Sequence, residues 1–312
     1  MALLPPDPLF CLKSDMGHIH NICFISNDSF TTHLLAATEE GYVYLWNLKT
    51  NRVESKQKLG TSIQAIHYIN PDLITQEKTG LIQLWTVDEK SNYIMRKQFE
   101  SNGGYCRSII VNDILLFPHD NSTIVGITVN AFIQTLTLKP DLDKLGYVMC
   151  LEKVEIADNL YIAAGYETGD VILWNFLTTT QRSRFKLKEY ITSISFDSVI
   201  GRGVCGNSSN TLQFFTIDKN HEIKLKCEVS VTNEGCNVVR LRQDRKILAC
   251  AGWDGRLRLF SWKSLRILVV LNQHRKGITD VKFSPEVVEE WNSKIMAAAS
   301  ADGSISLWSL YN

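Results

Sequence analysis

The 312-residue sequence has no net charge, because 33 basic side chains balance 33 acidic ones. It therefore has no global field that would draw it to nucleic acid or to acidic lipid. It also has no apolar run near the roughly 18 residues that span a bilayer. Residues 1–8 contain neither a basic nor a long apolar segment of the kind found in secretory signals. We therefore expect a protein of the cytoplasm and nucleus without membrane contact.

The sequence also has few features of a chemical site. Its eight cysteines include no C-x-x-C pair and do not cluster, so we expect reduced, mostly buried thiols. A Gly-rich phosphate loop, a nucleophile elbow, paired carboxylates and a Cys/His dyad are all missing. The sequence therefore predicts a protein that is not an enzyme and that uses no cofactor and no small-molecule substrate.

What the sequence does have is an internal repeat. A short apolar run, a turn and an alternating strand recur, and the strand usually ends in Trp or Phe. The marker residues lie about 39 to 48 positions apart, close to the spacing of a four-stranded WD repeat. They are Trp46, Trp85, Ile127, Trp174, Phe215, Phe260 and Trp308. Seven markers predict an all-β, seven-bladed WD-repeat β-propeller that forms a single domain over residues 1–312.

The chain termini indicate how the last blade is completed. Only four residues follow Trp308, which leaves too little chain for the outer strand of blade seven. A short apolar segment at about residues 9–14 precedes the first inner strand and has no blade of its own. We predict that it pairs into blade seven and removes an exposed sheet edge. Five turns are expected to need a positive φ, at Gly41, Gly80, Gly169, Gly255 and Gly303.

Blade seven carries four residues at the spacing of the WD-repeat structural tetrad: His274, Ser300, Asp302 and Trp308. A Ser, a His and an Asp could instead form a hydrolytic triad. The repeat register already explains each of these residues, so we favour the structural role over a cryptic hydrolase. His18 and His20 form an H-x-H pair, but the sequence shows no third or fourth ligand, so we predict no metal site.

Aromatic residues in turns and inter-blade loops are the candidates for partner binding. Tyr166 and Trp253 occupy the same slot of the turn between the second and third strands of blades four and six. Tyr105 and Tyr190 lie in loops expected at the same rim. Exposed aromatics and arginines are typical anchors of protein interfaces. The alternative is that each ring packs against a neighbouring blade.

A basic stretch in blade six supports a different hypothesis, a chromatin or nucleic-acid adaptor. Its residues are Arg240, Arg242, Arg245, Lys246, Arg256, Arg258 and Arg266. Such charges usually form a solvated face, and the neutral chain makes nucleic acid the less favoured partner.

Several stretches resemble one family more specifically. They are PPDPLF (5–10), GYCRSI (104–109), LKPDLDKLGYVMCL (138–151), AGYETGDVILW (164–174), DRKILACAGWD (244–254) and ISLWSLY (305–311). GYCRSI, LKPDLDKLG and the terminal SLWSLY are not generic to WD repeats. Through them the chain resembles the guanine nucleotide-binding protein subunit beta-like protein 1 family, related to fungal ASTRA-associated WD-repeat proteins.

The resemblance implies a scaffold that acts with the triple-T co-chaperone in the maturation of phosphatidylinositol-3-kinase-like kinases. Co-chaperone subunits and these kinases are then the expected protein partners. In some lineages it implies a component of a chromatin-remodelling complex. A G-protein β-like signalling scaffold is a further alternative. It is disfavoured because the chain starts with its closing strand, without the coiled-coil helix that grips a γ subunit.

Overall fold

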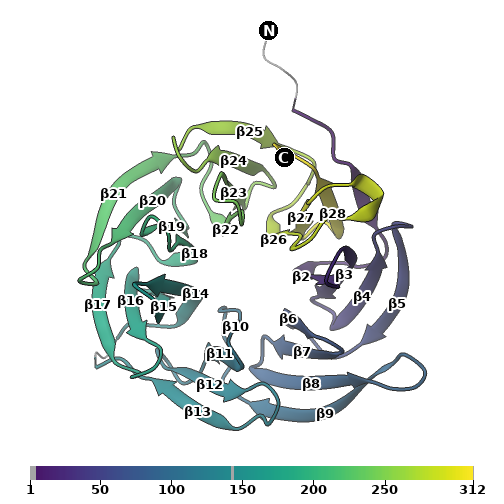
Figure 1. Ribbon diagram of the computed structural model, residues 1–312, viewed down its shortest axis with the longest axis horizontal. Coiled ribbons are helices and arrows are strands. Elements are labelled where there is room, and N and C mark those ends of the chain that lie inside the picture. Colours follow the sequence, from purple (N-terminus) through teal and green to yellow (C-terminus); the bar gives the residue numbers. More distant parts are fainter. Residues whose placement is uncertain (1–4, 142–143, 312) are drawn as a thin grey trace. The chain divides into compact units, whose positions relative to one another are not determined.

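The computed structural model describes residues 5–141 and 144–311. Within them the chain forms seven four-stranded antiparallel sheets, the blades of a β-propeller, so the predicted fold class is confirmed (Figure 1). The one helical element of these described residues is the short 3-10 turn η1 (Glu289–Trp291). In the described part of the chain, no helix is long and apolar enough to cross a membrane. All eight cysteines are free thiols.

The chain divides into two compact units. Unit 1 comprises Met1–Glu77, Ile82–Gln98 and Arg242–Asn312, and unit 2 comprises Lys78–Leu81 and Phe99–Leu241. The predicted single domain over 1–312 stays a prediction. Residues 1–4, 142–143 and 312 of that range lie outside the described residues, as do two residues of the family stretch 138–151.

Blades one and seven belong wholly to unit 1, and blades two and six are shared between the units. Blade one contains β2 (Ile19–Ser26), β3 (Thr31–Thr38), β4 (Tyr42–Asn47) and β5 (Arg52–Lys58). Blade two contains β6 (Ile63–Ile69), β7 (Asp72–Glu77), β8 (Leu81–Val87) and β9 (Tyr93–Glu100). Blade six contains β22 (Cys236–Leu241), β23 (Ile247–Gly252), β24 (Leu257–Ser261) and β25 (Ile267–Leu271).

Unit 2 holds blades three, four and five. Blade three contains β10 (Ile109–Val111), β11 (Ile114–Pro118), β12 (Ile124–Thr128) and β13 (Gln134–Leu138). Blade four contains β14 (Val148–Ile156), β15 (Asn159–Tyr166), β16 (Asp170–Asn175) and β17 (Gln181–Lys186). Blade five contains β18 (Ile191–Asp197), β19 (Arg202–Asn207), β20 (Thr211–Ile217) and β21 (Ile223–Ser230).

Blade seven confirms the predicted strand exchange. Its sheet has the order β1-β28-β27-β26, with β1 (Phe10–Lys13), β26 (Ile278–Phe283), β27 (Met296–Ser300) and β28 (Ser304–Trp308). The N-terminal strand pairs antiparallel with β28, and Leu12 lies opposite Ile305. Both side chains are fully buried in one apolar cluster with Ala299. In Figure 1 the purple N-terminal segment accordingly runs beside the yellow β28.

The predicted repeat markers all lie on the third strand of their blades, from Trp46 in β4 to Trp308 in β28. Six of the seven side chains are buried, and the Trp85 ring in β8 is partly buried. The five predicted turn glycines all have positive φ, between 74° and 98°. Tight turns of this conformation favour glycine because it has no Cβ to clash with the backbone.

Candidate protein-binding rim

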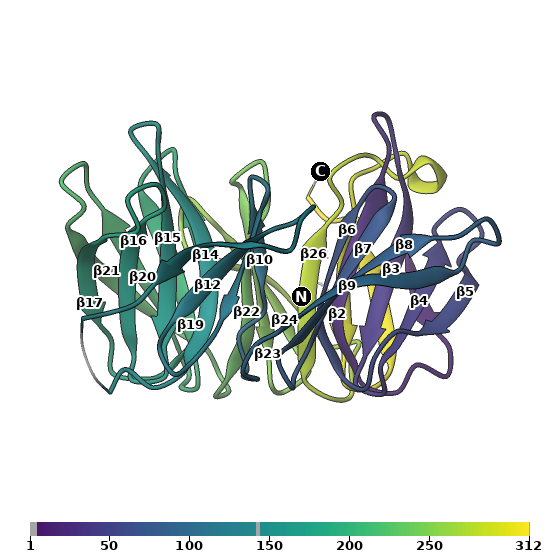
Figure 2. The ribbon, with the colours of Figure 1, turned by 90° about the horizontal axis from the view of Figure 1, so that it is seen from below.

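The strands of each unit run between two ends, and the connections gather at those ends (Figure 2). Turns between the second and third strands share one end with the loops that join consecutive blades. In unit 1 these segments touch. A Cβ at Gly255 would lie 2.8 Å from the carbonyl oxygens of His274 and Lys276, and one at Gly303 would lie 2.9 Å from that of Gly17. We call this set of connections, residues 14–18, 39–41, 59–62, 253–256, 274–277 and 301–303, the unit 1 rim.

Trp253 is the exposed aromatic of the unit 1 rim. It follows β23 directly, and 43% of its surface is exposed. A Cβ at Gly277 would lie 3.2 Å from the Trp253 carbonyl oxygen, so its turn packs on the loop that carries Arg275 and Lys276. Both of these cationic side chains are exposed, as is Arg256 two residues beyond Asp254. An exposed Trp in a surface segment that also carries exposed Arg and Lys side chains is a typical anchor for a protein partner.

The predicted tyrosines all lie in unit 2, and the structure corrects one of them. Tyr105 is 73% exposed, and Tyr190 is partly buried. Tyr166 is fully buried, so it is removed from the candidate binding residues, and the alternative of core packing holds for this ring. It is the last residue of β15, opposite Val148, and packs in a cluster with Trp174. Burial accordingly raises the pKa of the Tyr166 phenol.

Sequence analysis missed another exposed tyrosine in unit 2. Tyr147 is 49% exposed and lies just before β14. Its carbonyl oxygen accepts a hydrogen bond from the Glu167 amide at 2.9 Å, which holds this loop against the β15–β16 turn. Its position directly after Gly146, in a polar inter-blade loop, was the available signal. Partner binding by Tyr105, Tyr190 and Trp253 stays a prediction.

A hydrogen-bond network joins two segments of the unit 1 rim to the sheet of blade seven. His274 Nδ1 lies 3.3 Å from Asp302 Oδ2, and His274 Nε2 lies 2.8 Å from Ser306 Oγ. Trp308 Nε1 donates to the same Ser306 Oγ at 2.8 Å. Asp302 also accepts from the Arg275 amide at 2.9 Å. The network therefore fixes the loop that carries the exposed cations to the sheet of blade seven.

The structure places Ser306, not Ser300, in this network. Ser300 Oγ lies 3.1 Å from the carbonyl oxygens of Lys276 and Gly277 and accepts from the Asp302 amide at 3.1 Å. The predicted tetrad is thus corrected at one position. Ser306 lies two residues before Trp308 on the same strand, so both side chains point to one face of the sheet. Ser300 anchors the loop before β26, whereas His274 bonds Ser306 at 2.8 Å and Ser304 at 3.2 Å.

The network predicts acid sensitivity. Burial lowers the pKa of His274 below its ordinary value of 6.5, and the neighbouring Asp302 offsets this only partly. The unfolded chain therefore binds the proton first, and stability falls as the pH drops below about 6.5. We expect a fall of at most about 1.4 kcal/mol per pH unit from this group in urea unfolding between pH 7.5 and pH 5. His274→Gln should show a shallower dependence, whereas an equal slope in both proteins would contradict this assignment.

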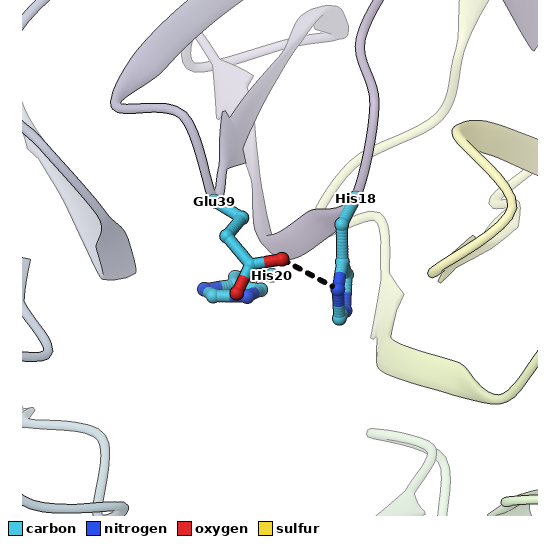
Figure 3. Close-up of side chains that lie close together, drawn as sticks. All are labelled: His18, His20 and Glu39. Atoms are coloured by element: carbon cyan, nitrogen blue, oxygen red, sulfur yellow. Dashed lines mark ion pairs between the residues drawn. The ribbon is translucent and has the colours of Figure 1, made fainter.

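The H-x-H pair has a third neighbour that the sequence did not reveal. His18 Nδ1 lies 3.1 Å from Glu39 Oε2, and His20 packs edge-on against His18 with ring centroids 4.6 Å apart (Figure 3). One ligand atom from each of these three residues lies within 4.8 Å of the others. Glu39 is thus a third candidate ligand, contrary to the expectation from the sequence, because β3 ends at Thr38 and brings Glu39 beside the start of β2.

The basic stretch of blade six is largely paired with acidic groups. Arg258 is buried and donates to Asp254 Oδ2 at 2.6 Å. Arg242 pairs with Asp244 at 2.8 Å and donates to the carbonyl oxygens of Leu310 and Tyr311. These arginines hold turns and the C-terminal segment in place, so the stretch provides fewer charges for a phosphate backbone than its sequence indicates.

Comparison with known proteins agrees with the fold and extends it. The family model described as WD domain, G-beta repeat, matches residues 265–309. The chain is 30% identical to guanine nucleotide-binding protein subunit beta-like protein 1 of Mus musculus, over 98% of this chain and 97% of the relative. It is 25% identical to ASTRA-associated protein 1 of Schizosaccharomyces pombe, over 99% and 100%. The chain is also 30% identical to ASTRA-associated protein 1 of Schizosaccharomyces japonicus, over 57% of this chain and 51% of that relative.

The similarity to the mouse and fission-yeast proteins extends over nearly the whole of all three chains, and all seven blades fall within it. It therefore concerns the complete set of repeats and not one WD unit alone. The chain belongs to the WD-repeat family of guanine nucleotide-binding protein subunit beta-like protein 1, and it is also similar to ASTRA-associated protein 1 of fission yeast.

Proposed function

We propose that the protein is a non-enzymatic scaffold that binds protein partners through the unit 1 rim. The observation that carries this proposal is the exposed Trp253, whose turn packs on the loop of Arg275 and Lys276 and also carries the exposed Arg256. Hot spots of protein interfaces are enriched in Trp and Arg. The network of His274, Asp302, Ser306 and Trp308 holds the loop of Arg275 in place before a partner arrives, which lowers the entropy lost on binding.

The partner class follows from the family. One group of relatives is named for association with ASTRA, and this chain aligns with the fission-yeast member over its full length. We propose that the protein works in an ASTRA-type assembly, together with the triple-T co-chaperone, in the maturation of phosphatidylinositol-3-kinase-like kinases. The places of action proposed are the cytoplasm and the nucleus. Chromatin association is then a property of the assembly and not of a DNA-binding surface on this chain.

Affinity purification of the tagged full-length protein from its own cells, followed by mass spectrometry, tests this proposal. We expect co-chaperone subunits and at least one large kinase of this class to be enriched over a tag-only control. Treatment of the lysate with nuclease should leave that enrichment unchanged, because the proposed contacts are protein–protein. Recovery of neither class would contradict the proposed assembly while leaving the fold untouched.

A further inference from the structure

His18, His20 and Glu39 meet at the unit 1 rim, where β2 begins and β3 ends. Figure 3 shows the Glu39 carboxylate directed at the His18 ring, with the His20 ring beside it. The Glu39 amide also donates to the His18 carbonyl oxygen at 2.9 Å, so the backbone fixes the spacing of these two residues. Two imidazoles and a carboxylate are therefore held together by secondary structure and not by chance contact of long side chains.

Part of the role of His20 is structural. Its Nδ1 lies 3.1 Å from the Ile63 carbonyl oxygen on the first strand of the next blade. Two other blades make the same kind of bond from the equivalent strand position. Thr279 Oγ1 donates to the Ile19 carbonyl oxygen at 2.7 Å, and Thr192 Oγ1 donates to that of Cys236. A threonine is thus sufficient for this bond, so the bond to the next blade does not by itself require histidine at position 20.

The bond to Ile63 also sets the tautomer of His20. A carbonyl oxygen can only accept, so Nδ1 carries the hydrogen and the lone pair of the neutral ring is on Nε2. Histidines that bind metals are commonly oriented in this way, with one ring N–H on a backbone carbonyl and the other nitrogen on the ion. His20 is buried, whereas His18 and Glu39 are partly open to solvent.

The distances suit a tetrahedral ion. In a site with bonds of about 2.0–2.2 Å, neighbouring ligand atoms lie roughly 3.4 Å apart. The contact between His18 Nδ1 and Glu39 Oε2 is 3.1 Å, and all three ligand atoms lie within 4.8 Å of one another. The His18–Glu39 pair is therefore already close to tetrahedral spacing, and the ligand atom of His20 lies within 4.8 Å of both. Two imidazoles favour Zn²⁺ over Mg²⁺ or Ca²⁺, which prefer oxygen ligands.

We propose that His18, His20 and Glu39 form a Zn²⁺ site with three protein ligands. The fourth coordination position is left to water or to a side chain of a bound partner, because the His18 and Glu39 side chains are 36% and 48% exposed. The site lies on the unit 1 rim, and its existence does not depend on which protein binds there. Zn²⁺ would join the loop before β2 to the β3–β4 turn.

Calorimetric titration of ZnCl₂ into the full-length, chelator-treated protein tests the proposal. We expect one ion per chain, with affinity lowered more than about 100-fold in His18→Ala and in Glu39→Gln. His20→Thr keeps the bond type that Thr279 and Thr192 form, so it should fold with a similar melting curve yet lose the ion. His33→Ala is the matched control, because His33 Nε2 pairs with Glu54 at 3.0 Å outside this group. It should bind Zn²⁺ like the wild-type protein.

Cysteine thiolates are the competing ligands, and Co²⁺ distinguishes them. Co²⁺ bound by nitrogen and oxygen shows ligand-field absorption without the strong charge-transfer band of thiolate ligation. We expect the former in the wild-type protein and its loss in His20→Thr. Equal affinity in wild type, His18→Ala and Glu39→Gln, or a thiolate band, would overturn the proposal. So would the absence of any binding in the wild-type protein.

Discussion

Removal of residues 1–14 is expected to lower the melting temperature of the protein sharply, because it takes β1 out of blade seven. The loss uncovers the edge of β28, to which Phe10, Cys11, Leu12 and Lys13 are paired. An unpaired strand edge also invites association with other chains. We therefore expect aggregation on heating at protein concentrations at which the intact chain remains dispersed.

A single substitution isolates the packing contribution of this strand. Leu12 is fully buried, so Leu12→Ala should lower the free energy of unfolding by about 2–5 kcal/mol. Lys13→Ala, at the exposed neighbouring position, should change it by less than about 0.5 kcal/mol. Urea unfolding followed by tryptophan fluorescence measures both. An unchanged melting curve after removal of residues 1–14 would contradict the role of β1.

Asn21→Asp is expected to destabilise the protein by about 3–5 kcal/mol although it hardly changes the size of the side chain. Asn21 Nδ2 lies 2.6 Å from Asp280 Oδ2, and Asn21 Oδ1 accepts from the Ile66 amide at 2.9 Å. These bonds join the inner strands β26, β2 and β6 within buried surroundings. An introduced carboxylate would face Asp280 with like charge and without the donor that now bridges them.

The same substitution at an exposed site separates this repulsion from general effects of added charge. Asn159 is exposed and donates to the Ala157 carbonyl oxygen at 2.9 Å, so Asn159→Asp should cost less than about 1 kcal/mol. Chemical unfolding at neutral pH compares the two variants. An equal decrease in the free energy of unfolding for both variants would contradict a specific stabilising role of the Asn21–Asp280 bond.

The seven-bladed fold could be predicted because the same strand-and-turn pattern recurs along the sequence. The apolar alternation before each marker, and the glycine in most turns, placed the third strand of all seven blades, including β12, where Ile127 stands for an aromatic. The pairing of β1 followed from counting strands, since a blade that lacks an outer strand needs one from elsewhere. Neither inference required knowledge of side-chain contacts.

Exposure within the turns was less predictable. Tyr166 and Trp253 occupy similar positions in the sequence, but three residues separate Gly165 from Gly169 and only two separate Gly252 from Gly255. The longer turn leaves Tyr166 as the last residue of β15, opposite Val148, whereas Trp253 lies just beyond the end of β23. A difference of one residue in turn length therefore decides whether the aromatic side chain is buried or exposed.

Contacts between residues far apart in the sequence also could not be predicted. Ser306 and Ser300 are both serines of blade seven, and only the distances to His274 and Trp308 distinguish them. Glu39 joins His18 and His20 through the pairing of β2 with β3, which places residues about 20 positions apart side by side. Sequence spacing alone carries no such information.

Recovery of partners by Trp253→Ala, compared with Phe30→Ala, tests most directly the claim that this protein is a scaffold acting through the unit 1 rim. Phe30 is a matched aromatic of unit 1 with 39% of its surface exposed, and it lies in the β2–β3 connection at the opposite strand end. Both tagged variants should fold, as judged by their melting curves. We predict that Phe30→Ala recovers co-purifying proteins at wild-type levels and that Trp253→Ala recovers at least about tenfold less. Equal recovery by both variants would contradict the rim as the binding site.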